Sequence, residues 1–230
     1  MIRLYHHPLC PQSRFVRLML GEYGLEAELI EELAGARRHD FLLINPAGNT
    51  PVMIDEDGTR IVGAGPIAEY LDETHGLRLG AHRLLPPGSV ARAEVRRLTD
   101  WFNGKFFEEV SGHLTREKVF KRFLSSQQGG GAPDMAAVRV ARRNVLYHLA
   151  YLGFLTAHHN WLAGEAMTLA DLAAAAHLSV VDFLGDVPWD EDHGAKLWYA
   201  MMKSRPGFRP LLADRVRGLQ PSAVYADLDF

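Results

Sequence analysis

The fold is decided by residues 49–71, NTPVMIDEDGTRIVGAGPIAEYL. This stretch predicts a short strand after Pro51, a turn over residues 55–58, a second strand over 58–61 and a helix entered through glycine and proline near Pro66. A proline at the mouth of a strand cannot donate to the ladder, so an unusual backbone is expected at Thr50-Pro51, with a cis peptide bond as one form.

Length and composition exclude several classes of protein. The chain has 230 residues, of which 47% are hydrophobic and 23% charged, enough for one large or two small domains. Its net charge of −3 gives no general attraction to nucleic acid or to an anionic membrane, so neither is expected as a partner. No secretory signal or membrane span is visible, and a cytoplasmic location is expected. Cys10 is the single cysteine, which makes an internal disulfide impossible.

The order of the expected elements changes after residue 76. Before it, strands over 2–5 and 28–32 alternate with helices over 11–23 and 36–44, and the hairpin and a helix to His75 follow, which gives an α/β layer. Residues 77–89 contain Pro86-Pro87-Gly88 and are interpreted as a linker. Apolar spacing then predicts long helices over 90–124 and 134–157, a capped helix over 168–181 and another over 194–204. The predicted domains are residues 1–76 and 90–206, with a tail over 207–230.

Several short motifs occur together in a recognisable order. They are Leu4 to Pro11 leading into Arg14 to Arg17, Asn45-Pro46 before Thr50-Pro51-Val52, Ile67 to Leu71, the Thr168 to Asp171 cap, Trp198-Tyr199 and Arg205-Pro206. In this order the chain resembles the glutathione transferase superfamily. The resemblance implies a thioredoxin-like N-terminal domain followed by a C-terminal helical bundle. It also implies that the backbone beside a cis-proline at Thr50-Pro51 pairs with the cysteinyl part of glutathione.

Cys10 is the candidate nucleophile. It stands at the expected N-cap of a helix whose first residue is Pro11, a favoured position for proline, and the helix dipole favours a thiolate there. The alternative is that Cys10 packs as a small apolar residue, and both interpretations stay open. A serine-type transferase using Ser13 is a weaker hypothesis, because Ser13 falls inside the first helical turn.

The second half of the expected ligand site has lost its polar groups. Members that bind glutathione carry an acidic residue and a serine where this chain has Gly63 and Ala64, and Pro66 removes a backbone donor. Losing two charge-assisted contacts of roughly 1.5–3 kcal/mol each weakens binding by about two to four orders of magnitude. Weak or absent glutathione binding, no cofactor and a non-enzymatic role are therefore expected. The alternatives are a register shifted by one residue and compensation from elsewhere.

A narrower resemblance concerns the function. Motifs at 101–103, 128–135, 187–190 and 227–230 resemble an alphaproteobacterial subgroup of transferase-fold homologues that bind the tubulin-like division GTPase FtsZ. This implies a homodimer that binds FtsZ filaments at the division site and influences constriction. The expected partner contact is the tail, Asp227, Leu228, Asp229 and Phe230. The alternative function is a glutathione-dependent transferase or thiol transferase that uses Cys10.

Two other features of the sequence have ordinary interpretations. Arginines over 92–97 and 139–143 lie three and four residues apart, which indicates either a face for an acidic partner or a plain solvated surface. The pairs His6-His7 and His158-His159 are adjacent, so their side chains tend to point apart, and no metal site is expected.

Overall fold

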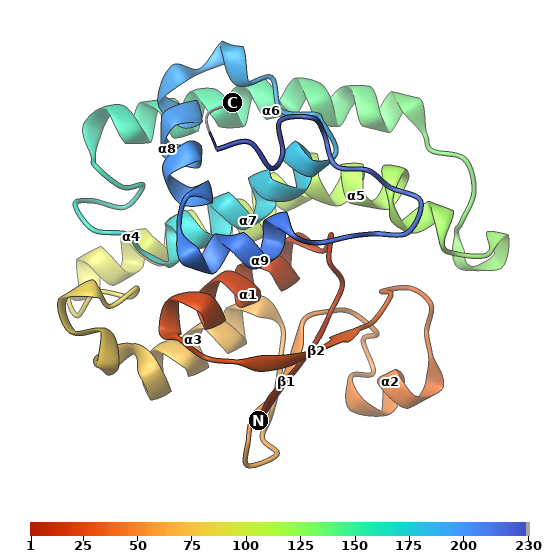
Figure 1. The fold of residues 1–230 in the computed structure, drawn as a ribbon, viewed down its shortest axis with the longest axis horizontal. Coiled ribbons are helices and arrows are strands. Elements are labelled where there is room, and N and C mark those ends of the chain that lie inside the picture. The colour runs from red at the N-terminus through yellow and green to blue at the C-terminus, as the bar shows by residue number, and fades with distance from the viewer. Residues whose placement is uncertain (229–230) are drawn as a thin grey trace.

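The N-terminal layer is a four-stranded sheet. The computed structural model describes residues 1–228 (Figure 1). The strand order of the sheet is β2-β1-β3-β4. Strand β1 (Ile2–His6) runs parallel to β2 (Ala27–Glu31) and antiparallel to β3 (Val52–Ile54), and β3 pairs antiparallel with β4 (Arg60–Val62). This confirms the predicted strand–helix–strand unit followed by a hairpin and helix.

Alternation along the strands gives the sheet two buried faces. Leu4 and Met53 join the main core under α1 (Pro11–Tyr23) and α3 (Ala64–His75), whereas Tyr5 and Val52 pack against Phe41 of α2 (His39–Ile44). Successive side chains of a strand point to opposite faces of the sheet. Neighbouring apolar residues of one strand therefore contribute to the two different hydrophobic clusters. Helices α1 and α3 consequently lie between the sheet and the rest of the molecule (Figure 1).

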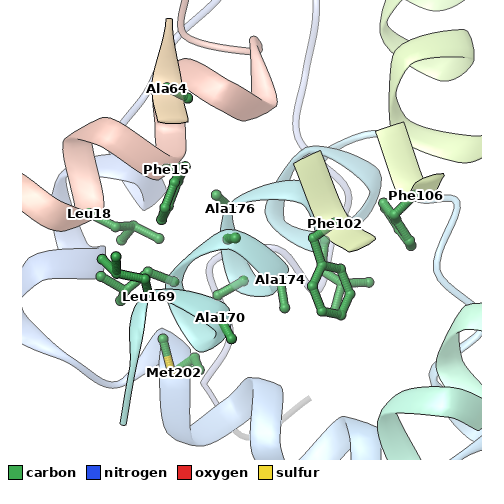
Figure 2. Close-up of a cluster of buried hydrophobic side chains, with 14 of the residues drawn as sticks. Phe15, Leu18, Ala64, Phe102, Phe106, Leu169, Ala170, Ala174, Ala176 and Met202 are labelled. Carbon is green, nitrogen blue, oxygen red and sulfur yellow. The ribbon is translucent and has the colours of Figure 1, made fainter. Parts of the chain in front are cut away.

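The C-terminal part is entirely helical around one buried helix, α7 (Leu169–Phe183). It packs against α1, α4 (Ser89–Asp100), a π-helical stretch over Trp101–Ser111 and α8 (His193–Lys203). The other helices of this part are α5 (Gly112–Lys118), α6 (Met135–His158) and α9 (Arg209–Leu212). Every residue of α7 is buried. Figure 2 shows how its small side chains, such as Ala170 and Ala174, lie between Leu18 of α1 on one side and Phe102 on the other.

Several predicted boundaries differ from those in the structure. The helix expected from residue 36 begins at His39, because Gly35 and Arg37 have φ values of +91° and +52°, which a helix does not accommodate. The helix expected over 90–124 changes to π geometry at Trp101 and ends at Lys118. A 3₁₀-helical segment, Gly76–His82, interrupted at Gly80 by a non-helical backbone, overlaps the first half of the expected linker over 77–89. The boundaries of the domains themselves stay a prediction.

Candidate functional site

Cys10 lies at the N-cap of α1, as the sequence predicts. Its backbone is extended (φ −84°, ψ 116°), and Pro11 occupies the first helical position. The side chain is 6% exposed, and its Sγ lies 3.8 Å from the carbonyl oxygen of Thr50. The α1 N-terminus and the loop before β3 therefore meet at the thiol.

The two histidines before Cys10 are uncharged at neutral pH. Burial, reinforced by the nearby Arg17, lowers the pKa of His6 to about 4. Burial and the charge of Arg14 likewise lower the pKa of His7 to about 4. Nδ1 of His7 accepts a hydrogen bond from the Leu9 N–H over 3.1 Å, so this imidazole shapes the loop that leads to Cys10. Its 3.8 Å approach to Glu31 is consequently no ion pair at pH 7.

Ser13 occupies the third position of α1 and is completely buried. Its hydroxyl has no hydrogen-bond partner among the described residues. The structure therefore places the Ser13 side chain in the protein interior rather than at a surface where a substrate binds.

The peptide bond between Thr50 and Pro51 is cis, the form the sequence suggested. The carbonyl oxygen of Pro51 accepts a hydrogen bond from the Gly63 N–H over 3.0 Å. The buried hydroxyl of Thr50 lacks a partner within residues 1–228. The two halves of the predicted ligand site are thus held together by the backbone.

The start of α3 carries no polar side chain. Gly63 is its N-cap with φ +90°, a conformation that favours glycine, and α3 begins at Ala64, two residues before the expected Pro66. Ala64 is 7% exposed, and its methyl group belongs to the main hydrophobic cluster with Phe15 (Figure 2). Because Pro66 has no N–H, the first turn offers the backbone donors of Ala64 and Gly65 alone.

An open, mainly apolar cavity of about 330 Å³ lies beside α5. It is lined by Phe107, Glu108, Gly112, His113, Thr115, Arg116 and Phe120. The ring of Phe120 meets that of His7 edge-on, with centroids 5.1 Å apart, which connects this cavity to the cysteine loop. Sequence reasoning missed it because its residues become neighbours only through the turn of α5.

The tail is tied to the helical layer as far as Asp227. Lys203 Nζ donates to the carbonyl oxygens of Val224 (3.1 Å) and Asp227 (2.6 Å), while Tyr225 is completely buried. Asp227, the last residue held by this clamp, and Leu228 after it are exposed. The predicted contact residues Asp229 and Phe230 lie outside the described residues.

Three of the six arginines of α4 and α6 form ion pairs with acidic side chains among the described residues. Arg96 pairs with Glu69 (2.8 Å), Arg97 with Glu94 (2.7 Å) and Arg142 with Asp186 (2.6 Å). These pairs favour the solvated-surface interpretation of the arginine spacing. Among residues 1–228, no cluster of three or more His, Cys, Asp or Glu side chains forms a candidate metal site, and none of the described helices is long and apolar enough to cross a membrane.

The comparisons with known proteins agree with this geometry. Residues 4–79 match the family model of the glutathione S-transferase N-terminal domain, and residues 114–206 match that of the C-terminal domain. The chain belongs to the glutathione S-transferase family. Members similar to it include FtsZ-localized protein A from Caulobacter vibrioides, which is 46% identical over 99% of this chain and 97% of that protein.

Two solved structures of this family are similar over the whole length. FzlA from C. crescentus superposes with a TM-score of 0.91 at 45% identity. The alignment covers 100% of this chain and 99% of the FzlA chain. A crystal structure of a glutathione S-transferase from Sinorhizobium meliloti 1021 superposes with a TM-score of 0.97 at 50% identity, with complete coverage of both chains. They confirm the fold predicted from the sequence.

Proposed function

We propose that this chain is a non-enzymatic protein of glutathione-transferase fold that binds FtsZ filaments and regulates constriction at the division site. The observation that carries the proposal is the 46% identity, along nearly the whole chain, to a protein named FtsZ-localized protein A. The apolar start of α3 supports it, because Gly63, Ala64 and Pro66 offer no side-chain group to the charged end of glutathione.

The tail is the proposed contact with FtsZ. The Lys203 clamp fixes the backbone at Val224 and Asp227, so Asp227 and Leu228 are presented in a defined position. A segment ordered before binding loses less conformational entropy when the complex forms. The acidic Asp227 and Asp229 fit a basic surface on the partner, and Leu228 and Phe230 add apolar area.

The proposed assembly is a homodimer. Val140, Tyr147 and Phe154 are each more than half exposed and stand seven residues apart on α6, so they form one apolar stripe along the helix. The rings of Trp101 and Tyr147 lie 6.3 Å apart and widen this stripe. A contiguous exposed apolar surface of this kind is typical of protein interfaces. Sedimentation equilibrium should give twice the chain mass, and Tyr147→Glu should shift the equilibrium towards the monomer.

Co-sedimentation tests the partner. FtsZ is assembled with GTP, the chain is added at physiological salt, and the pellet is quantified with an assembly-free sample as the blank. The wild type and the matched control Glu73→Lys, which changes an exposed acid of α3 outside the tail and the subgroup motifs, should pellet with filaments. Asp227→Lys should bind about tenfold more weakly or worse, because it reverses a charge at the contact. Wild-type protein left in the supernatant would contradict FtsZ binding. If Asp227→Lys pelleted to the same extent as the wild type, the tail contact would be rejected, and FtsZ binding itself would still stand.

Calorimetric titration tests the lost glutathione site. We expect no measurable heat of binding for the wild type and an affinity at least about tenfold higher for Ala64→Ser, which restores one hydroxyl. Gly65→Ser is the control, because the superfamily resemblance assigns no polar role to residue 65. Tight binding by the wild type would overturn the degenerate-site proposal.

A glutathione-dependent thiol transferase using Cys10 is the second candidate. It is favoured by the thiol at a helix N-terminus and by the structural likeness to the Sinorhizobium meliloti glutathione S-transferase. Turnover with glutathione that disappears in Cys10→Ala would establish it. Turnover that survives this substitution would exclude Cys10 as the nucleophile.

A further inference from the structure

The C-terminal segment returns to the N-terminal layer directly beside the loop that precedes Cys10. After α9 this segment, dark blue in Figure 1, runs towards α5 and then back to α8. Two independent sets of contacts join it to residues 8–14, one polar and one apolar.

The polar set is centred on Arg14, which is completely buried. Its Nη1 donates to the Tyr225 hydroxyl and to Ser179 Oγ, both over 2.9 Å, and its Nη2 donates to Asp214 over 3.1 Å. Its Nε donates to the carbonyl oxygen of Pro8 over 2.6 Å. One guanidinium therefore holds both the C-terminal segment and the cysteine loop.

Tyr225 completes this arrangement. Its hydroxyl donates to the carbonyl oxygen of Leu211 over 2.9 Å while it accepts from Arg14. Its ring lies 5.7 Å from the guanidinium carbon of Arg14 and meets the ring of Phe183 edge-on. Withdrawal of Tyr225 would leave a buried cation without part of its coordination, which is a costly state.

The apolar set is a small hydrophobic cluster separate from the main core. It contains Leu9, Val119, Val180, Phe183, Val216 and Tyr225. Leu9 is completely buried there and is the residue immediately before Cys10. The C-terminal residues Val216 and Tyr225 thus supply part of the surface on which the cysteine loop rests.

We propose that residues 214–227 form a latch on the cysteine loop, so that release of Tyr225 and exposure of the Cys10 thiol belong to one coupled equilibrium. Arg14 and Tyr225 are its positioning residues. Because coupling between two sites is reciprocal, a group bound at Cys10 loosens the C-terminal segment to the same extent that release of the segment exposes Cys10. The latch does not depend on FtsZ being the partner, and it predicts that a partner gripping the tail changes the reactivity of the thiol.

The first test is the rate at which iodoacetamide alkylates Cys10, measured by intact-mass spectrometry. Tyr225→Phe removes the hydroxyl and keeps the ring, and it should raise the alkylation rate about tenfold through the loss of a charge-assisted hydrogen bond. Tyr70→Phe, the same change at a partly exposed tyrosine of α3 whose hydroxyl donates to Asp55, should react like the wild type. Equal rates for all three proteins would overturn the latch.

The second test uses the wild-type sequence and so does not depend on the folding of a variant. Hydrogen exchange is compared before and after alkylation of Cys10. The Ser222 amide donates to the carbonyl oxygen of Phe183 in α7, and the Tyr225 amide donates to that of Ser222 within the segment. Both amides should exchange about tenfold faster after alkylation. Unchanged protection of both amides, with Cys10 fully alkylated, would equally overturn the proposal.

Discussion

The indole Nε1 of Trp198 donates a hydrogen bond to Oδ1 of Asp171 over 3.1 Å, which joins α8 to the start of α7. The same carboxylate accepts from the Leu162 N–H over 3.0 Å and, in a capping box, from the Thr168 N–H over 2.9 Å. Asp171 is completely buried, so the cap predicted from the sequence is also a junction between three segments.

Replacing this carboxylate should destabilise the whole chain. Asp171→Ala leaves at least three buried donors without an acceptor, and we expect the free energy of unfolding to fall by about 3–5 kcal/mol. Urea denaturation followed by circular dichroism measures the change. Asp190→Ala, an exposed acid, should differ from the wild type by less than about 0.5 kcal/mol. A similar small effect for both variants would show that the junction contributes little.

Asp214 holds two buried guanidinium groups. It accepts from Arg17 over 2.8 and 2.9 Å and from Arg14 over 3.1 Å, with its own side chain 10% exposed. Asp214→Asn keeps the shape but removes the charge, so unfolding should become easier by about 3–5 kcal/mol. Glu73→Gln provides the exposed control. A midpoint of urea unfolding unchanged from the wild type would contradict this assignment.

Because His177 is buried, the free energy of unfolding should decrease as the pH falls. Burial lowers the pKa of His177 to about 3, below the ordinary value of 6.5, so the unfolded chain binds the proton more readily than the folded one. Its contribution is fully present above pH 6.5 and is lost progressively as the pH falls towards 3. Between pH 7 and pH 5 the loss from this group is about 2 kcal/mol.

A variant without this titration isolates the effect. His177→Gln should show a decrease in unfolding free energy between pH 7 and pH 5 that is smaller by about 2 kcal/mol than in the wild type. His39→Gln, which changes an exposed imidazole, should retain the wild-type pH dependence. Identical slopes for His177→Gln and the wild type would refute the prediction.

The positive φ of Gly63 should make the melting temperature sensitive to replacement of this glycine. Gly63→Ala places a side chain on a backbone of φ +90°, a conformation that is strained for alanine. There is space for the new Cβ, since among the described residues Pro66 Cδ is the one non-adjacent atom within 4 Å of it. The strain should lower the free energy of unfolding by about 1–3 kcal/mol. Gly65→Ala in the same helical turn has an ordinary φ and open space, so it should be neutral or stabilising. Thermal unfolding of the two variants side by side makes the comparison. Equal melting temperatures would rule out backbone strain as the reason for glycine at position 63.

Local signals predicted most of the elements correctly. Apolar alternation identified the strands, proline at the first position placed the start of α1 at Pro11, and the Thr168–Asp171 pair placed the start of α7. The helix expected over 36–44 was too long, because the positive φ of Arg37 comes from the path of the loop and has no counterpart in residue type. The family resemblance implied that Cys10 and Thr50 belong to one ligand site, and this stays a prediction. The structure places Cys10 Sγ 3.8 Å from the carbonyl oxygen of Thr50.

By itself, then, the sequence determined the family, the order of strands and helices and the absence of polar side chains at positions 63, 64 and 66, because each of these depends on residue identity and short-range spacing. Only the tertiary structure decided that Arg14 meets Tyr225 across 211 positions and that Leu9 rests on the returning C-terminal segment. Every tyrosine and aspartate in the chain carries an oxygen that is chemically able to accept a hydrogen bond from a buried arginine. Which of them does so depends on how α1, α7 and the C-terminal segment pack together.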